Sequence, residues 1–542
     1  MRKATPSHQI RNAIRGRTSQ FHPSHNRYKW FVLANVMIGT FMAVLDSTIV
    51  NVGLPKIMAS FGVGIDKIEW VITAYMLALA VALPTSGWMA DRFGYKRMYF
   101  FGMLLFTFGS FLCGVSGEEN MLIFSRVIQG LGAGCLMPIG MAIVSREFPP
   151  ERRGVALGFW AIAAAASVSF GPLIGGYLVD NFTWQLIFDV NIPVGIFGLL
   201  VTIVVQREYV HPQARRFDWL GFISVSVFLP LVLFALTEGN AATNSAGWHA
   251  PYILICFAIS FIALAVFITT EFTVKEPLID LRLLGNHNFM LANVIMFVFS
   301  VGMFGSTFLL PLYLQNSLGY TAIQSGAVFL PVGIIQGMMS PIAGIFGDRT
   351  NAKVPMLLGV ALLGISFIMN SRLSYLTEHN FIMLSLYMRG FAMGVLFTPL
   401  SAIAMFELPR EKLAQASGLF NVLRQLGGSF GVALLATLLT TRVNYHSQMY
   451  GSAINSTSQA FHTITGNMSY FIQHDVGSSA ANAVKMGQAV IMAHVNKQAF
   501  IQGVDDDFLM AGLITLVGAI PIFWLHVKKK NQKEKSVQQP KH

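Results

Sequence analysis

Charged side chains are scarce in this chain of 542 residues. Asp, Glu, Lys and Arg make up only 11% of it, while hydrophobic residues make up 54% and the mean hydropathy is +0.58. An average soluble protein is about 25% charged. So few charges cannot cover the water-facing surface of a soluble protein of this size, and the composition therefore excludes that class.

Cysteine is also scarce, and the common catalytic and cofactor motifs are missing. Cys113, Cys135 and Cys256 each lie inside an apolar run, so we expect no disulfide framework, no metal site and no other cofactor. The sequence contains no phosphate-binding loop of the Walker type, no HExxH and no CxxC. We therefore expect neither an enzyme nor an ATP-driven pump.

Long apolar runs are abundant, and each has about the 20 residues that a helix needs to cross a bilayer. Short alternating strands, which would indicate a transmembrane barrel, are not found. The fold class that we predict is an all-α polytopic membrane protein with fourteen membrane helices. Their approximate bounds are 30–52, 68–90, 97–116, 121–144, 155–179, 184–205, 217–237, 250–271, 289–314, 320–346, 354–371, 380–405, 414–439 and 508–527.

Lysine and arginine are distributed unevenly around these runs. An even number of helices puts both termini on one side, where 28 of the 37 basic residues fall, against 6 in the opposite loops. The positive-inside rule therefore places both termini in the cytoplasm. The net charge of +12 is an orientation signal, so we expect no nucleic-acid partner, and the basic tail is expected to lie on the lipid bilayer.

Two parts of the chain carry similar motifs. GWMADRFGYKR (87–97) closes the second predicted helix, and GIFGDRTNAK (344–353) closes the tenth. RVIQGLGAGCLMP (126–138) and RGFAMGVLFTP (389–399) each place an arginine, glycines and then a proline inside a helix. Such internal repeats are typical of transporters. The sequence thus predicts two related halves of six helices, with two further helices inserted between them.

Three more motifs complete a pattern that one family shares. They are LDSTIVNVGLP (45–55), SFGPLIGGYL (169–178) and WQLIFDVNIPVG (184–195). With them the chain resembles the major facilitator superfamily, specifically its fourteen-span drug:proton antiporter branch of the EmrB/QacA type, from about residue 30 to 528. The resemblance implies proton-coupled efflux of lipophilic or cationic drugs or toxic compounds by alternating access, in the bacterial cytoplasmic (inner) membrane.

Other functions agree with the same motifs and stay open at this point. One is export of an endogenous metabolite, a fatty acid or a siderophore. Another, from a different class, is a membrane sensor or channel that does not transport. The partners expected for the transporter are a small lipophilic substrate, protons and the lipid bilayer.

The predicted helices and loops divide the chain into segments with different roles. We expect a basic cytoplasmic N-terminus (1–29), an N-terminal six-helix half (30–205), two inserted linker helices (206–288), a C-terminal six-helix half (289–528) and a basic cytoplasmic tail (529–542). The C-terminal half includes an unusually long extracytoplasmic segment (440–507), in which residues 480–502 are predicted to form an amphipathic helix. The resemblance implies that this segment docks a periplasmic membrane-fusion adaptor and an outer-membrane channel; the alternative is an interfacial helix without a partner.

An acidic residue in the first predicted helix is the main candidate for function. Asp46 is expensive inside a membrane, and such residues are functional candidates by default. Arg126 lies at a matching depth in the fourth helix, since at about 1.5 Å per residue both are roughly 9–14 Å below the outer surface. We predict that Asp46 couples protons or binds a substrate cation, with Arg126 as its partner and Gln129 in the same network. The alternative is that they only fix helix packing.

Other charged residues in or near the helices are weaker candidates. Asp189 departs from the family pattern, which usually has an apolar residue two places before the Asn of WQLIFDVNIPVG, and it is either a second proton or cation site or simply exposed at the surface. Arg424 is either an anchor that reaches the membrane surface or a buried gating charge.

Two glycine-containing motifs are expected to control conformation. The loop 2–3 motif consists of Gly87, Asp91, Arg92, Gly94, Lys96 and Arg97, with a degenerate second copy at Asp348 and Arg349. The resemblance implies that it latches the two halves together on the cytoplasmic side. The antiporter motif consists of Gly171, Pro172, Gly175 and Gly176, which predict a tightly packed and bendable helix.

Overall fold

Helices account for all regular secondary structure in the part of the chain that the structure describes. The computed structural model describes residues 27–63, 65–209, 217–239, 244, 246–349, 351–453, 459–475 and 479–526. These residues contain no strand, and fourteen helical segments among them are long and apolar enough to cross a membrane. The predicted all-α polytopic fold and the predicted number of membrane helices are therefore confirmed.

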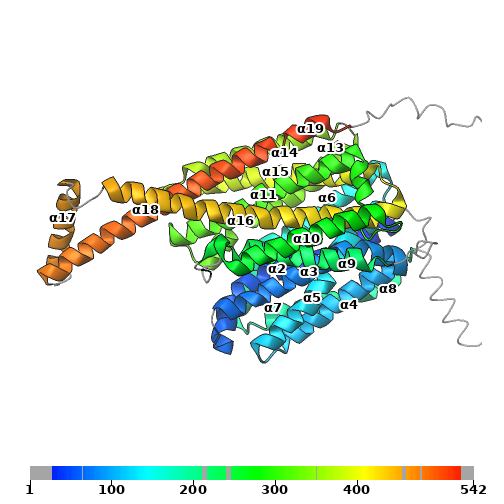
Figure 1. The fold of residues 1–542 in the computed structure, drawn as a ribbon, viewed down its shortest axis with the longest axis horizontal. Coiled ribbons are helices and arrows are strands. Elements are labelled where there is room, and N and C mark those ends of the chain that lie inside the picture. Colours follow the sequence, from blue (N-terminus) through cyan, green and yellow to red (C-terminus); the bar gives the residue numbers. More distant parts are fainter. Residues whose placement is uncertain are drawn as a thin grey trace, which may run out of the picture.

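The helices run back and forth along one axis, so the bundle has two ends (Figure 1). The first membrane helix begins at Tyr28 and the last helical turn ends at Trp524, both at the same end. This end is termed the terminal side. The opposite end, beyond which α17 (Gln459–Asp475) projects, is termed the distal side.

The N-terminal half consists of six membrane helices, of which the sixth is broken into two pieces. They are α2 (Tyr28–Phe61), α3 (Ile65–Phe93), α4 (Tyr95–Gly114), α5 (Glu119–Glu147), α6 (Arg153–Asn181) and the pair α7 (Leu186–Asp189) and α8 (Asn191–Val205). Glycines let their backbones approach closely. A Cβ on Gly109 of α4 would lie only 2.6 Å from the backbone nitrogen of Gln129 in α5. This contact brings polar groups of both helices into one buried cluster.

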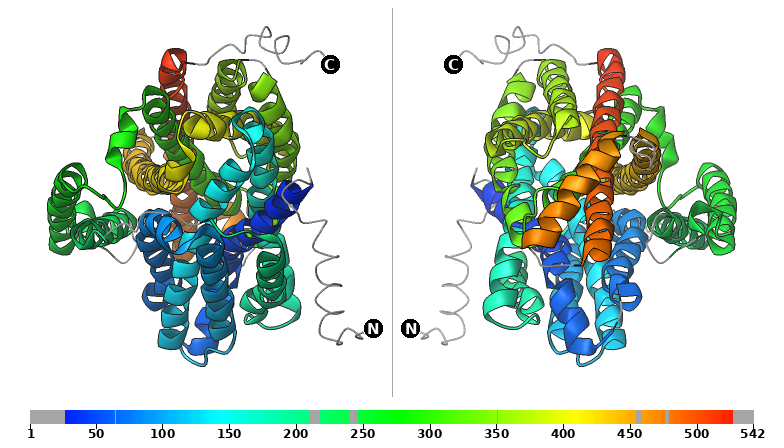
Figure 2. Two further views of the ribbon diagram at one scale, coloured as in Figure 1. Left: turned by 90° about the vertical axis from the view of Figure 1, so that its right-hand side faces the viewer. Right: turned by 90° about the vertical axis from the view of Figure 1, so that its left-hand side faces the viewer.

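The C-terminal half repeats this arrangement with longer helices at its end. It consists of α11 (His287–Asn316), α12 (Ala322–Ala327) with α13 (Leu330–Arg349), α14 (Lys353–Met369), α15 (His379–Phe406), α16 (Leu413–Ala453), and α18 (Ala480–Val517) with α19 (Ile520–Trp524). Short 3-10 helices lie in the connections at Pro150–Arg152, Gly247–His249, Leu281–Gly285, Asn370–Arg372 and Arg410–Lys412. Figure 2 shows the two halves on opposite sides of a central seam, the N-terminal half in blue to cyan.

The two helices that connect the halves in the sequence lie on one flank of the bundle (Figure 2). The first, α9 (Trp219–Glu238), contacts α3 of the N-terminal half and α16 of the C-terminal half. The second, α10 (Pro251–Thr273), packs mainly on α9. Before α10, the indole nitrogen of Trp248 donates a hydrogen bond to the Thr437 hydroxyl of α16 at 2.9 Å. The inserted pair therefore covers the seam where α3 meets α16.

The polar segment 440–507 differs from its predicted form. The expected amphipathic helix at 480–502 is the first part of α18, which continues without a break into the last membrane helix, and α16 likewise runs on to Ala453. Both helices project past the bundle toward α17 (Figure 1). Asp506 of α18 joins them at the base, since it pairs with Arg442 at 2.6 Å and His446 at 2.8 Å, both of α16. The predicted cytoplasmic tail 529–542 and most of segment 1–29 lie outside the described residues.

The two halves make contact along α3 with α16 and along α6 with α13. Near the terminal side two hydrogen bonds also join the halves: the hydroxyl of Ser417 in α16 donates to the carbonyl of Pro138 in α5 at 2.7 Å, and buried Arg153 of α6 donates to the carbonyl of Met405 in α15. Toward the distal side the halves separate around a cavity of about 780 Å³. The two halves are therefore in contact at the terminal side, and the cavity lies between this contact and the distal side.

Candidate functional site

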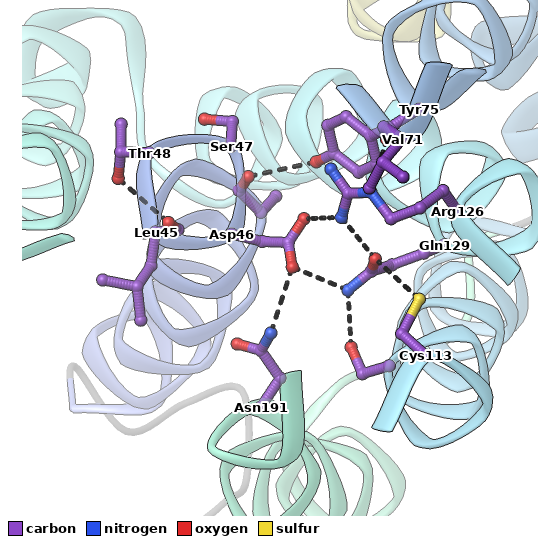
Figure 3. Close-up of polar contacts among 12 residues, drawn as sticks. Leu45, Asp46, Ser47, Thr48, Val71, Tyr75, Cys113, Arg126, Gln129 and Asn191 are labelled. Carbon is purple, nitrogen blue, oxygen red and sulfur yellow. Dashed lines mark hydrogen bonds and ion pairs between the residues drawn. The ribbon is translucent and has the colours of Figure 1, made fainter. Parts of the chain in front are cut away.

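Asp46 and Arg126 form a buried ion pair inside the N-terminal half (Figure 3). A guanidinium nitrogen of Arg126 lies 2.5 Å from Asp46 Oδ2, and the side chains are 1% and 0% exposed. The second carboxylate oxygen, Oδ1, accepts hydrogen bonds from Gln129 at 2.7 Å and from Asn191 at 3.3 Å. One carboxylate is thus held by side chains from α5 and α8 as well as by its own helix.

The rest of the cluster holds Arg126 and Gln129 in place. Arg126 Nη1 also donates to Gln129 Oε1 at 2.5 Å, and its Nε donates to the carbonyl of Val71 at 3.0 Å. Gln129 Nε2 in turn donates to the hydroxyl of Ser110 in α4 at 2.7 Å. A buried charge is tolerated only when it is paired and hydrogen-bonded, and this network meets both conditions.

A tyrosine separates this network from the central cavity. Tyr75 of α3 has its ring 4.1 Å from the Arg126 guanidinium, and its hydroxyl donates to the carbonyl of Ala43 at 3.1 Å. Tyr75 and Ala43 line the cavity, whereas Asp46, Arg126 and Gln129 do not. The network therefore lies one side chain behind the cavity wall. A molecule in the cavity would not touch the network in this conformation.

The central cavity lies between the halves and has few charges. Its wall comes from both halves and from α9, and much of it is methionine and phenylalanine. Glu238, Arg389 and Arg424 are the charged residues among the described residues that line it. Asn421 and Gln425 add amide groups near Arg424 on α16. Such a wall suits a molecule that is mostly apolar, because a few polar groups can orient it.

Asp189, the second predicted acidic candidate, lies apart from the network. It ends α7 at the distal side and is half-buried, near the end of α4, where a Cβ on Gly114 would overlap its carboxylate. No hydrogen bond or ion pair joins it to Asp46 or Arg126 in the described part of the chain. The residue of this motif that does reach Asp46 is Asn191.

The loop 2–3 motif divides into two groups with different contacts. Gly87 lies at the boundary between the halves, since a Cβ there would be 2.9 Å from Gln415 Cα in α16. Asp91 is buried one turn further along α3 and accepts a hydrogen bond from the Tyr95 hydroxyl at 3.0 Å. Gly87 therefore contacts the other half, whereas the hydrogen bond of Asp91 stays within the N-terminal half, and the latch remains a prediction.

The second group of this motif contacts the segment that directly follows α8. Gly94 has a φ of 102°, which favours glycine, and it lets α4 begin directly after the end of α3. The backbone amides of Lys96 and Arg97 donate to the carboxylate of Glu208, each at 3.1 Å, and Arg97 also pairs with it at 3.5 Å. Arg92 is exposed. The side chains of Asp348 and Arg349, the degenerate second copy, lie outside the described residues.

The antiporter motif packs α6 against both halves. A Cβ on Gly175 would lie 2.8 Å from Ile49 Cγ1 of α2, and one on Gly171 would overlap Thr48 of the same helix. Gly176 faces the other way, because a Cβ there would be 3.0 Å from Ile323 of α12. The backbone of Pro172 belongs to α6, while its side chain lies outside the described residues. The motif thus lets α6 fit closely between α2 and the C-terminal half.

Sequence reasoning missed several residues of the network, chiefly Asn191, Ser110 and Tyr75. The signal for Asn191 was present, because it is a lone amide in the apolar run that α8 begins. Ser110 and Tyr75 carry no such signal, since serine and tyrosine are common in membrane helices. Arg153 was also missed: it is the first residue of α6 and reads in the sequence like an ordinary positive loop residue, yet it is buried between the halves.

Comparison with known proteins agrees with this geometry. The family model described as Major Facilitator Superfamily matches residues 36–432. The Bacillus subtilis protein named uncharacterized MFS-type transporter YhcA is 31% identical over 93% of this chain and 94% of its own length. The Escherichia coli multidrug export protein EmrB is 33% identical over 77% of this chain and 81% of its own length.

Two solved structures share the fold at low sequence identity. The human organic anion transporter MFSD10 superposes with a TM-score of 0.59 at 13% identity, covering 91% of this chain and 99% of that one. The proton:xylose symporter XylE superposes with a TM-score of 0.56 at 12% identity, covering 92% and 95%. At such identities the likeness concerns the fold alone.

Proposed function

Because the chain belongs to the major facilitator superfamily, we propose that it exports lipophilic compounds across the bacterial cytoplasmic membrane in exchange for protons. The family and the transporter relatives establish a multi-pass secondary transporter rather than an enzyme, and they confirm the resemblance inferred from the motifs. A sensor or channel that does not transport, the alternative from another class, does not agree with this membership. The name of the Escherichia coli relative supports a range of drug substrates, and the distribution of basic residues supports cytoplasmic termini.

The buried Asp46–Arg126 pair is the observation that supports proton coupling. Protonation of Asp46 removes the negative charge that Arg126 faces at 2.5 Å, so the guanidinium needs another arrangement. The carboxylate is shared by α2, α5 and α8, and the bonds of Gln129 extend the network to α4. A proton on Asp46 therefore alters the interactions that hold these helices together. That gives proton occupancy a means of biasing the helix arrangement.

The same geometry favours one of the two roles predicted for Asp46. Competition between a proton and a substrate cation for one carboxylate requires that the substrate reach it. Asp46 is fully buried and lies behind Tyr75, outside the cavity wall. We therefore assign Asp46 to proton coupling, with Arg126 and Gln129 as its partners, and place the substrate in the cavity.

Alternating access follows from the closure between the halves. The cavity is shut off from the terminal side by the contacts of α3 with α16 and of α6 with α13. Release of the Gly87 and Arg153 contacts would open the cavity toward the terminal side. We infer that, with cytoplasmic termini, closure at the terminal side is the closure that the outward-facing state of an exporter needs.

Substitution of Asp46 tests the proposal. The full chain and Asp46→Asn are expressed in a host without its main efflux pumps, and the accumulation of ethidium, dansylglycine and dansylamide is measured. We expect the wild type to lower the accumulation of at least one probe, and Asp46→Asn to abolish this effect. Asp180→Asn, which changes an exposed carboxylate at the distal end of α6, should behave as wild type. Asp189→Asn should also retain export, because no hydrogen bond or ion pair joins Asp189 to Asp46 or Arg126 among the described residues, and loss of export would make Asp189 a second proton site.

A second measurement distinguishes loss of coupling from loss of folding. Wild type and Asp46→Asn are purified, checked by size exclusion and thermal unfolding, and reconstituted in liposomes with an imposed proton gradient. The folded variant should move substrate down its gradient but no longer against it. Uphill transport at the wild-type rate by Asp46→Asn would refute the role of Asp46.

A further inference from the structure

The two halves share sequence around the site but differ in one charge. LANV occurs in α2 (33–36) and again in α11 (291–294), and Ser-Thr follows in both helices, at 47–48 and at 306–307. Asp46 stands before the first Ser-Thr pair, whereas Gly305 stands before the second. Each half keeps its arginine, so the C-terminal half has the cation without the carboxylate.

The arginine of the C-terminal half has no acidic partner in the described part of the chain. Arg389 is 2% exposed, and its Nη2 donates to the carbonyl of Met303 at 3.0 Å and to the hydroxyl of Thr307. Its other terminal nitrogen, Nη1, is buried and has no hydrogen-bond partner. The guanidinium also lies 5.4 Å from the ring of Phe367. A buried guanidinium held only by neutral groups is poorly compensated.

A second arginine lines the same cavity from α16. Arg424 has a weak contact, at 3.8 Å, between its Nη2 and the sulfur of Met137, and no ion pair joins it to a carboxylate among the described residues. The acidic lining residue, Glu238, is the last residue of α9 at the distal side. Arg389 lies ten residues inside α15 from that side, about 15 Å deep at 1.5 Å per residue. Among the described lining residues, the two cations therefore lie inside the bundle and the one acid lies at its distal side.

This charge distribution indicates which kind of ligand the cavity would bind. We propose that the cavity binds amphipathic organic anions, whose acidic group is attracted by Arg389 and Arg424 of the wall and whose apolar body lies against Met296, Phe299 and Phe329. Guanidinium groups match carboxylates and sulfonates because they donate paired hydrogen bonds to two oxygens. A lipophilic cation inside the cavity would meet the two arginines, whereas Glu238, the acid among the described lining residues, lies at the distal side. The inference gives a substrate class to the proposed export function, and it rests on that function only for the direction of movement.

Matched fluorescent probes test the charge preference. Dansylglycine, dansylamide and dansylcholine carry the same fluorophore with an anionic, a neutral and a cationic group. Each is titrated against the purified full chain in nanodiscs of zwitterionic lipid near neutral pH, with empty nanodiscs as the blank. We expect dansylglycine to bind at least about tenfold more tightly than dansylcholine, as a charge-assisted contact should provide. Equal affinities, or tighter binding of dansylcholine, in the wild-type protein alone would overturn the inference.

Arginine variants then locate the preference. Arg389→Gln and Arg424→Gln should each reduce the ratio of dansylglycine to dansylcholine affinity, and the double variant should bring it close to one. Arg372→Gln, at an exposed arginine outside the cavity, should leave the ratio unchanged. Binding of dansylamide should stay the same in all variants, which shows that the cavity is intact. An unchanged ratio in the double variant with normal dansylamide binding would also overturn the inference.

These outcomes are separable from those of the proposed export. Binding is measured without a proton gradient, so the charge preference can hold even if Asp46→Asn still transports uphill. Conversely, a cation preference would leave proton-coupled export standing and remove only the substrate class.

Discussion

The two halves of the bundle surround a buried arginine in different ways. In the N-terminal half, Arg126 is neutralised by Asp46 and enclosed behind Tyr75, away from the cavity. In the C-terminal half, Arg389 has only neutral partners and lines the cavity. The same scaffold thus holds a neutralised charge pair in one half and, among the described residues, a cation without an acidic partner in the other. In the function that we propose, this difference divides the tasks, with proton chemistry in one half and recognition of substrate charge in the other.

Removing either arginine should have the largest effect on stability, and the effect should differ between the two halves. Arg126→Gln leaves the Asp46 carboxylate buried without its cation, which should destabilise the protein by about 3–5 kcal/mol if the carboxylate stays ionised. Arg389→Gln removes a cation and leaves no carboxylate behind, so its effect on stability should be much smaller. Thermal unfolding of both variants in the same detergent measures the difference.

A double variant controls for the effect of the glutamine itself. Asp46→Asn/Arg126→Gln should recover most of the stability that Arg126→Gln loses, because no charge is then left unpaired. It should not recover proton-coupled transport. Equal destabilisation by Arg126→Gln and Arg389→Gln would mean that the two arginines are equivalent after all.

The paired half was easier to predict from the sequence than the open one. Asp46 and Arg126 are both rare charges in apolar runs, and residue counting alone puts them at the same depth. Asn191 and Tyr75 could not be assigned in this way, because their roles depend on how each helix is rotated about its axis. Arg389 and Arg424 line a cavity because of the way the two halves fit together, and no local sequence pattern predicts that fit.

Other differences from the predictions have equally local causes. The hydropathy of the chain falls near residue 440, so the predicted membrane helix stops there, but α16 continues to Ala453 because polar residues also form helix outside a membrane. Lys96 and Arg97 were grouped with the latch between halves by motif alone. Their amides bind Glu208, which lies more than a hundred residues later, in the segment that directly follows α8.

A carboxylate placed beside Arg389 should make the C-terminal half resemble the N-terminal one. Thr307 already accepts a hydrogen bond from Arg389, so Thr307→Asp puts an acid at that contact. We expect dansylglycine affinity to fall about tenfold or more, since the guanidinium is then neutralised, and dansylcholine affinity to rise. Fluorescence titration in nanodiscs measures both, and Thr307→Asn, which adds no charge, is the matched control. If Thr307→Asp and Thr307→Asn behave alike, Arg389 does not set the charge preference.

The contact between the halves at the terminal side offers a smaller perturbation. A methyl group on Gly87 would lie 2.9 Å from Gln415 Cα and 3.0 Å from the backbone carbon of Ala414, so Gly87→Ala should disfavour the closed contact by about 1–3 kcal/mol. Spin labels at the exposed positions Arg152→Cys and Arg410→Cys, one in each half, report the separation. We expect a larger population of long distances in Gly87→Ala. Gly466→Ala, where nothing lies within 4 Å of an added Cβ, should leave the distribution unchanged.

The distal projection should have the smallest effect on transport by the isolated protein. Deleting residues 451–490 and joining the ends with a short glycine–serine linker removes α17 and the outer turns of α16 and α18. It spares the contacts of Arg442 and His446 with Asp506, which hold the two helices together at the base. Transport in liposomes should therefore stay within about twofold of wild type, because the projection touches neither the cavity nor the Asp46 network.

Whole cells then decide what the projection does. If it docks a periplasmic membrane-fusion adaptor and an outer-membrane channel, the deletion variant should lose efflux from two-membrane cells at unchanged surface expression, while its activity in liposomes persists. Unchanged efflux from such cells would instead support an interfacial helix pair without a partner. Loss of transport in liposomes would contradict both interpretations of the projection, since it would show that transport by the isolated protein itself requires the distal helices.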